Sequence, residues 1–105
     1  MLPWIYLAIA GLLEVVWASA LKASNGFSQP GPAVVTLVAA AGSFWLLGLA
    51  MRDLPLGTAY SVWVGIGAVG AVAFGILWFG DPATPLRLAA IAMILGGVAL
   101  LKVAG

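Results

Sequence analysis

The sequence predicts an all-α membrane protein with four transmembrane helices per subunit, and three observations lead to that class. Of the 105 residues, 65% are apolar, and only four Lys or Arg and three Asp or Glu carry a charge. Soluble domains have about a quarter of their residues charged, so this chain cannot cover a water-facing surface. The charges and the Pro/Gly clusters divide it into four apolar stretches of about the length that a helix needs to cross a bilayer. We expect residues 1–105 to form one domain.

The first two apolar stretches predict helices over residues 4–21 and 33–51. The first is interrupted only by Glu14, and the second contains no charge. Between them the segment from Lys22 to Pro32 is rich in turn-forming residues. Ala18-Ser19-Ala20 has the small residues of a signal-peptide cleavage site, but no basic segment precedes the apolar run and Glu14 interrupts it. We therefore expect a retained helix rather than a signal peptide.

The other two stretches predict helices over residues 58–79 and 86–104. The third stretch is free of charge and ends at a Gly/Pro-rich segment that begins at Gly80. The fourth has only 14 residues between Arg87 and Lys102. Long Arg and Lys side chains reach the lipid headgroups while their stems stay in the apolar region, which lengthens the usable span.

The flanking charges predict an unusual topology. Lys and Arg normally gather on the cytoplasmic side and set the orientation of a membrane protein. With four spans, Arg52 and Lys102 flank one membrane face, whereas Lys22 and Arg87 flank the other. This balance predicts dual topology, with chains inserted in both orientations and paired as an antiparallel homodimer. A fixed orientation set by a subtler feature, such as span hydrophobicity, is the alternative.

The composition also excludes several function classes. With no Cys and no His, the chain lacks disulfides, thiolate chemistry, and the commonest general base and metal ligand. A net charge of +1 without a basic run argues against a nucleic-acid partner. We therefore expect no catalytic residue, no metal and no cofactor, and a transporter rather than an enzyme, with the lipid bilayer around it.

Glu14 is the residue that most strongly indicates function. It lies near the middle of the first span, where an ionised side chain costs about 2.5–3.5 kcal/mol on insertion scales. All four basic residues lie at helix ends, so the sequence offers no fixed counterion at that depth. A proton or an external cation is then its expected partner. The alternative is a permanently protonated Glu that hydrogen-bonds a neighbouring helix as a packing contact.

Helical spacing selects the side chains expected around Glu14. Gly11 and Trp17 lie one turn to either side on the same face. On the second helix Thr36 and Ser43 share a face, and Ser43 is at about the depth of Glu14. A hydroxyl at that position can bond toward the carboxylate or, alternatively, to its own backbone four residues earlier.

The third helix carries an aromatic and glycine stripe. Tyr60 and Trp63 can hydrogen-bond a carboxylate and can present their rings to a cation. An interfacial aromatic belt is the alternative for this pair. Gly65 and Gly67 lie in mid-helix and predict a hinge. On the fourth helix Gly96-Gly97 predicts a dimer contact, because small residues let helices approach closely.

Four runs carry a likeness to a known family: Gly11-Leu12-Leu13-Glu14-Val15-Val16-Trp17-Ala18, Leu21-Lys22, Leu54-Pro55-Leu56-Gly57-Thr58-Ala59-Tyr60-Ser61-Val62-Trp63 and Gly65-Ile66-Gly67-Ala68-Val69-Gly70. Over its whole length the chain resembles the small multidrug resistance family of proton-coupled exporters, and most of all its guanidinium exporter subtype. The resemblance implies four-helix subunits in an antiparallel homodimer in the bacterial plasma (inner) membrane.

The resemblance also implies roles for individual residues. Glu14 of each subunit would form a shared site for protons and substrate, with Trp63 lining it. Tyr60 would move between positions in which it bonds Glu14 as the cavity changes sides. In the guanidinium subtype, Trp17 and Ser43 would belong to the hydrogen-bond network of the carboxylate, whereas the multidrug subtype typically has a small residue where Trp17 stands. Asp81 stands where relatives commonly carry Glu.

The expected function is that of a proton-coupled antiporter. It would export guanidinium and small guanidinyl compounds by alternating access, with protons and substrate competing for the paired Glu14 carboxylates. Three alternatives are a multidrug exporter of quaternary ammonium or aromatic cations, a passive ion channel, and an accessory subunit of a heterodimer.

Overall fold

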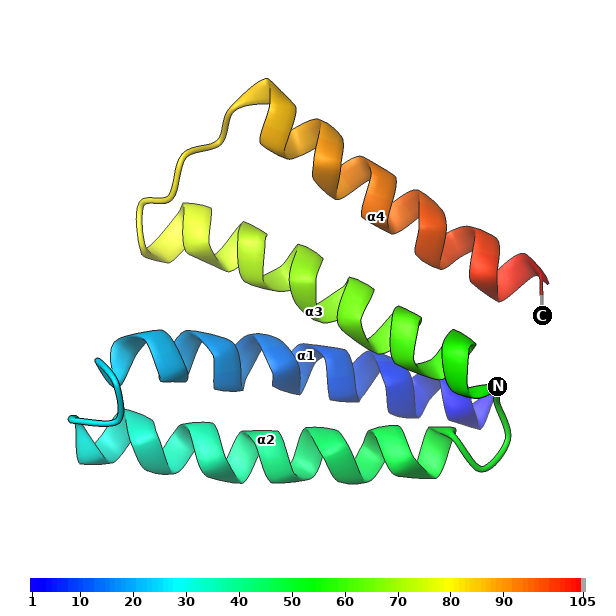
Figure 1. Ribbon diagram of the computed structural model, residues 1–105, viewed down its shortest axis with the longest axis horizontal. Coiled ribbons are helices and arrows are strands. Elements are labelled where there is room, and N and C mark those ends of the chain that lie inside the picture. The colour runs from blue at the N-terminus through cyan, green and yellow to red at the C-terminus, as the bar shows by residue number, and fades with distance from the viewer. Residues whose placement is uncertain (105) are drawn as a thin grey trace.

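Four helices joined by short loops make up the computed structural model, which describes residues 1–104 (Figure 1). They are α1 (Leu2–Ala23), α2 (Pro30–Ala50), α3 (Leu56–Trp78) and α4 (Pro85–Ala104). All four are long and apolar enough to cross a membrane, which confirms the predicted all-α membrane fold with four spans.

Seven of the eight helix ends differ from the sequence-based bounds, by one to three residues, and the end of α4 agrees. α2 begins at Pro30, where residue 33 was predicted, and α4 begins at Pro85, where residue 86 was predicted. Both differences have one cause: Pro lacks an N–H and has a helical φ, so it fits the first turn of a helix as well as it fits a loop. α1 extends to Ala23 and so includes Lys22 in its last turn, where a cation faces the negative end of the helix dipole.

The loop between α1 and α2 is shorter than the sequence suggested. Asn25, Gly26 and Phe27 all have positive φ, so the chain reverses within a few residues. Ser24 is fully buried and holds this turn together. Its hydroxyl donates to the carbonyl of Leu21 at 2.7 Å and accepts from the N–H of Phe27 at 3.0 Å.

α1 lies between its neighbours and packs against both α2 and α3 (Figure 1). The core consists of Trp63 and of small and medium apolar residues of these three helices: Leu7, Ala10, Leu47, Ala50, Ala59 and Val62. Small side chains at such contacts let the helix backbones come close. This packing brings the middle of α1 directly against the middle of α3.

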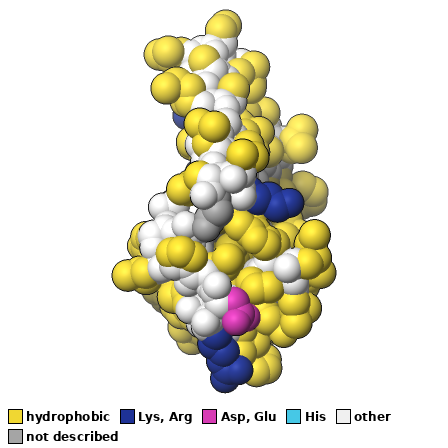
Figure 2. All heavy atoms as spheres, turned by 90° about the vertical axis from the view of Figure 1, so that its right-hand side faces the viewer, with side chains coloured by type: hydrophobic (Ala, Val, Ile, Leu, Met, Phe, Trp, Pro, Cys, Tyr) yellow, Lys and Arg dark blue, Asp and Glu magenta, His cyan; other side chains and the backbone are white. Residues whose placement is uncertain are grey.

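α4 is the least buried of the four helices. Within residues 1–104 it packs against α3, and none of its residues is buried. Its last turn also reaches α1, since the Lys102 ammonium lies 5.7 Å from the centre of the Trp4 ring. Figure 2 shows the molecule from the end at which both termini lie, and apolar side chains cover most of that view. Large apolar side chains are also exposed along the sides of the helices, among them Val38, Leu77 and Met93. An apolar surface of this extent requires lipid or another protein subunit around it.

Candidate functional site

Glu14 projects from α1 toward the bare backbone of α3 at Gly67. A Cβ atom on Gly67 would overlap the Glu14 carboxylate, so the missing side chain provides the space for this group. The Oε1 atom of Glu14 is buried and has no hydrogen-bond partner within residues 1–104. A buried polar atom without a partner is costly. This oxygen therefore has an unused hydrogen-bonding capacity, which a proton, a cation or a donor from another subunit would satisfy.

Two more glycines set the distance between α1 and α3. A Cβ on Gly11 would lie 2.5 Å from the Cγ2 atom of Ile66, and a Cβ on Gly70 would overlap Val15. Gly11, which was predicted to lie at the site, thus sits in the same α1–α3 contact as Glu14. We call this contact, from Gly11 to Lys22 on α1 and from Ile66 to Gly75 on α3, the α1–α3 seam.

Ser43 joins three helices at the level of the site. It is fully buried, donates to the carbonyl of Ala10 at 2.7 Å and accepts from the indole N–H of Trp63 at 2.9 Å. The carbonyl of Ala10 is also the regular helical acceptor for the amide of Glu14, four residues later. Ser43 therefore bonds to the turn that carries Glu14 rather than to the carboxylate itself. Thr36, by contrast, bonds within its own helix, to Pro32 at 2.9 Å.

Aromatic rings connect the three helices beside these polar groups. Phe44 of α2 lies between Trp17 and Trp63, with ring centres 6.4 and 5.7 Å away and edge-to-face geometry. Tyr60 continues the chain of rings, 5.6 Å from Trp63. The four rings, Trp17, Phe44, Trp63 and Tyr60, form what we call the aromatic row.

The aromatic row contains both bound and free polar groups. The indole N–H of Trp17 is buried and has no partner within residues 1–104. Trp63 is buried, whereas Tyr60 is 53% exposed and its hydroxyl makes no hydrogen bond within the same residues. Sequence reasoning missed Phe44, although its place directly after Ser43, in a pair with Trp45 on a helix whose other large residues are aliphatic, was a usable signal.

The remaining predicted residues lie around α3 and α4. A Cβ on Gly65 would lie 2.5 Å from the Cγ2 atom of Val98, so Gly65 is a close contact between α3 and α4. α3 runs as one helix through both proposed hinge residues, Gly65 and Gly67. Gly96 and Gly97 have no atom within 4 Å of an added Cβ and lie on the open side of α4.

Comparisons with known proteins agree on one family. Residues 2–94 match the family described as Small Multidrug Resistance protein. A "Guanidinium exporter" of Yersinia pseudotuberculosis serotype I (strain IP32953) is 52% identical over 103 residues, covering 98% of this chain and 99% of the relative. Proteins with the same name from Escherichia coli K12 (54% identical) and Salmonella typhimurium LT2 (52%) match over 101 residues, 96% of each chain.

Proposed function

The chain belongs to the small multidrug resistance family, and we propose that it exports guanidinium across the membrane. Its four membrane-spanning helices and this membership make it a multi-pass transporter of the bacterial inner membrane. Relatives named guanidinium exporters, 52% and 54% identical over nearly the full length, support the choice of substrate.

One carboxylate oxygen of Glu14 is buried and has no hydrogen-bond partner in the part of the chain that the structure describes, and this observation carries the proposal. Guanidinium is planar and offers parallel N–H donors, which match a carboxylate in a bidentate arrangement. The aromatic row, which begins with Trp17 one turn from Glu14, offers ring faces to a planar cation. Its rigid indole and phenyl groups would favour a small flat cation over a bulky one.

Competition for the Glu14 oxygens would couple export to protons. A carboxyl group that holds a proton cannot pair with guanidinium, and one that holds guanidinium has no place for the proton. If the empty, deprotonated site rarely changes sides, each proton that enters must exchange for a cation that leaves. Proton influx then drives export.

Alternating access would come from a pair of subunits. In an antiparallel homodimer the two chains act as inverted repeats, and an exchange of their conformations turns an inward-facing cavity outward. The balanced flanking charges and the unburied α4 support such pairing. Bending at Gly65 and Gly67 would allow the exchange, with Tyr60 free to change partners.

Reconstitution of the purified chain in liposomes with an outward guanidinium gradient tests the proposal. We expect proton movement opposite to guanidinium in the native chain and none in Glu14→Gln, which keeps the shape of the side chain. Asp53→Asn, an exposed carboxylate in the loop between α2 and α3, is the matched control and should behave as native. Equal proton movement in the native chain and Glu14→Gln, or transport of tetraalkylammonium in preference to guanidinium, would overturn it.

A further inference from the structure

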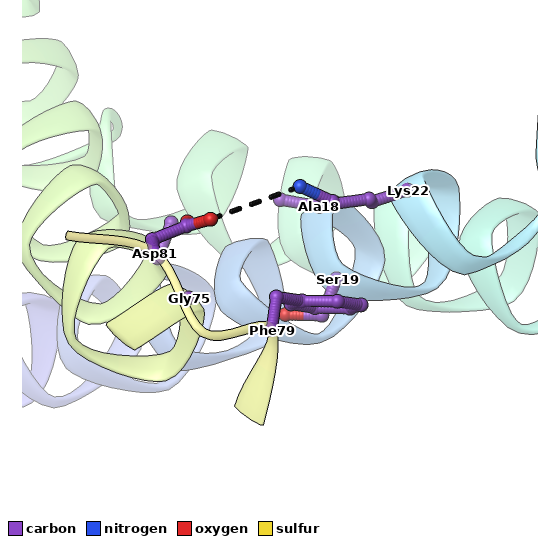
Figure 3. Close-up of a pocket in the computed structure, with 7 residues that line it drawn as sticks. Ala18, Ser19, Lys22, Gly75, Phe79 and Asp81 are labelled. Carbon is purple, nitrogen blue, oxygen red and sulfur yellow. Dashed lines mark ion pairs between the residues drawn. The ribbon is translucent and has the colours of Figure 1, made fainter. Parts of the chain in front are cut away.

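A pocket lies at the end of the α1–α3 seam, away from Glu14 (Figure 3). Its lining includes Ala18, Ser19 and Lys22 of α1 together with Gly75, Phe79 and Asp81 from the end of α3 and the turn that follows. A carboxylate, an aromatic ring and an ammonium group thus meet in one open hollow. The proposed exchange at Glu14 assigns none of them a role.

The backbone holds the Asp81 carboxylate in place. The N–H of Asp81 donates to the carbonyl of Gly75 at 3.0 Å, and its Oδ2 atom occupies the space that a Cβ on Gly75 would take. Gly80 has φ of 73°, which lets the chain fold back onto the end of α3. The carboxylate is therefore fixed against a helix rather than carried on a free loop.

The pocket already holds a cation, the side chain of Lys22. Its Nζ atom lies 3.9 Å from Oδ1 of Asp81 and 5.1 Å from the centre of the Phe79 ring (Figure 3). The Lys22 side chain is 60% exposed, and such a long, exposed ion pair contributes little. A carboxylate matches the planar fork of a guanidinium ion, and an aromatic face attracts a cation. The weakly paired ammonium is therefore the group with which a free guanidinium ion would compete.

The pocket lies along the same helix contact as Glu14, further toward the end of the seam. Ala18 and Lys22 follow Glu14 by one and two helical turns on the same face of α1. On α3, Gly75 follows Gly67, which contacts Glu14, by the same two turns. Two turns correspond to about 12 Å along the helix axis. The two carboxylates thus lie along one seam, one at mid-span and one at its end.

We propose that this pocket is a second, outer cation site, in which Asp81 and Phe79 bind guanidinium in competition with Lys22. A cation held there is two helical turns from Glu14, and the outer site raises its concentration at the end of the seam. The choice of guanidinium as the ligand rests on the proposed function. The site itself rests on the pocket, the fixed carboxylate and the weakly paired ammonium.

Titration of guanidinium chloride into the purified Glu14→Gln protein tests the outer site, because this variant lacks the inner carboxylate. We expect saturable NMR shifts of the Ser19 and Phe79 amides that sodium chloride at equal ionic strength does not reproduce. Adding Asp81→Asn should raise the half-saturating concentration roughly tenfold, since an ionic hydrogen bond is lost. Adding Asp53→Asn should leave the half-saturating concentration unchanged. Adding Lys22→Met should lower it, and misfolding cannot produce such a gain in affinity.

Three results would overturn the outer site: NMR shifts that persist in Asp81→Asn, shifts that sodium chloride reproduces, and shifts that do not saturate. Each would show that Lys22 and Asp81 form a structural ion pair only. None of these results affects guanidinium-driven proton movement by the native chain, so the proposed function would stand. Conversely, Asp81-dependent binding in a chain that moves no protons against guanidinium would support the outer site and overturn the proposed function.

Discussion

The carboxylate of Glu14 lies in the space that a side chain at Gly67 would fill. This relationship links a sequence feature, a charge in mid-membrane, to the backbone of a second helix. It means that the position of the Glu14 carboxylate depends on α3 having no Cβ there. Gly67 therefore affects the site directly, besides any effect on the flexibility of α3.

Gly67→Ala should impair transport through this contact. The added methyl group overlaps the carboxylate and must displace it or push α1 from α3, and overpacking of this kind costs about 1–3 kcal/mol. We expect guanidinium transport in liposomes to fall roughly tenfold, the loss that about 1.4 kcal/mol, a value within this range, produces. Gly48→Ala on α2 is the matched control, because nothing lies within 4 Å of its added Cβ. Full transport by Gly67→Ala would contradict both the contact and the hinge.

Guanidinium binding should weaken as the pH falls. A proton on Glu14 excludes the cation, so below the point where the carboxyl group takes up its proton the half-saturating guanidinium concentration should rise by up to about tenfold per pH unit. Equilibrium binding to the purified protein over a pH series measures this slope. Any binding that remains in Glu14→Gln should lack the slope. A native chain whose affinity does not change with pH would show that proton and cation do not share the site.

Ser43→Ala should destabilise the fold around the site. The change leaves the buried indole N–H of Trp63 without its acceptor, and an unsatisfied buried donor costs about 1–3 kcal/mol. Thermal unfolding in detergent micelles measures the loss, and transport should fall with it because the turn bearing Glu14 loses its link to α2 and α3. Thr36→Val is the control, since that hydroxyl bonds only within its own helix. Equal melting temperatures for Ser43→Ala and Thr36→Val would refute the link.

Sequence reasoning found what depends on neighbouring residues and missed what depends on the packing of distant ones. The four spans follow from local hydropathy, and Glu14 was found because a charge within a span is conspicuous. The starts of α2 and α4 were misplaced because Pro suits a loop and a first helical turn equally. The partners of Ser43 lie on two other helices, so spacing along α2 cannot reveal them.

The pocket between Lys22, Phe79 and Asp81 is a clearer example of an arrangement that depends on the packing of distant residues. The sequence places Lys22 at the end of the first span and Asp81 in the segment after the third span, and it gives neither residue a partner. Their meeting depends on α1 packing against α3 and on the turn at Gly80, and neither is visible in the sequence around either residue. Phe79 faces Lys22 for the same reason.

Gly97→Leu should test whether α4 is the contact between two subunits. The position is open within the subunit, so a larger side chain meets no atom there and should leave the fold intact. If a second α4 packs against it, the leucine side chain holds the helices apart. We expect a shift from dimer to monomer in sedimentation in detergent, together with loss of transport. Dimers and transport at native levels would place the subunit contact elsewhere.

The balanced flanking charges predict that the chain inserts into the membrane in both orientations. Arg52 and Lys102 on one face balance Lys22 and Arg87 on the other, so neither orientation gains from the positive-inside preference. A reporter fused to the C-terminus should therefore be detected on both sides of the inner membrane. Asp53→Lys adds a positive charge next to Arg52 and should shift most chains to the orientation with that loop in the cytoplasm. Transport should then fall, because antiparallel pairs become scarce, and co-expression of a chain with added Lys in the opposite loop should restore it. A reporter found on one side only in the native chain would exclude antiparallel pairing of this chain with itself.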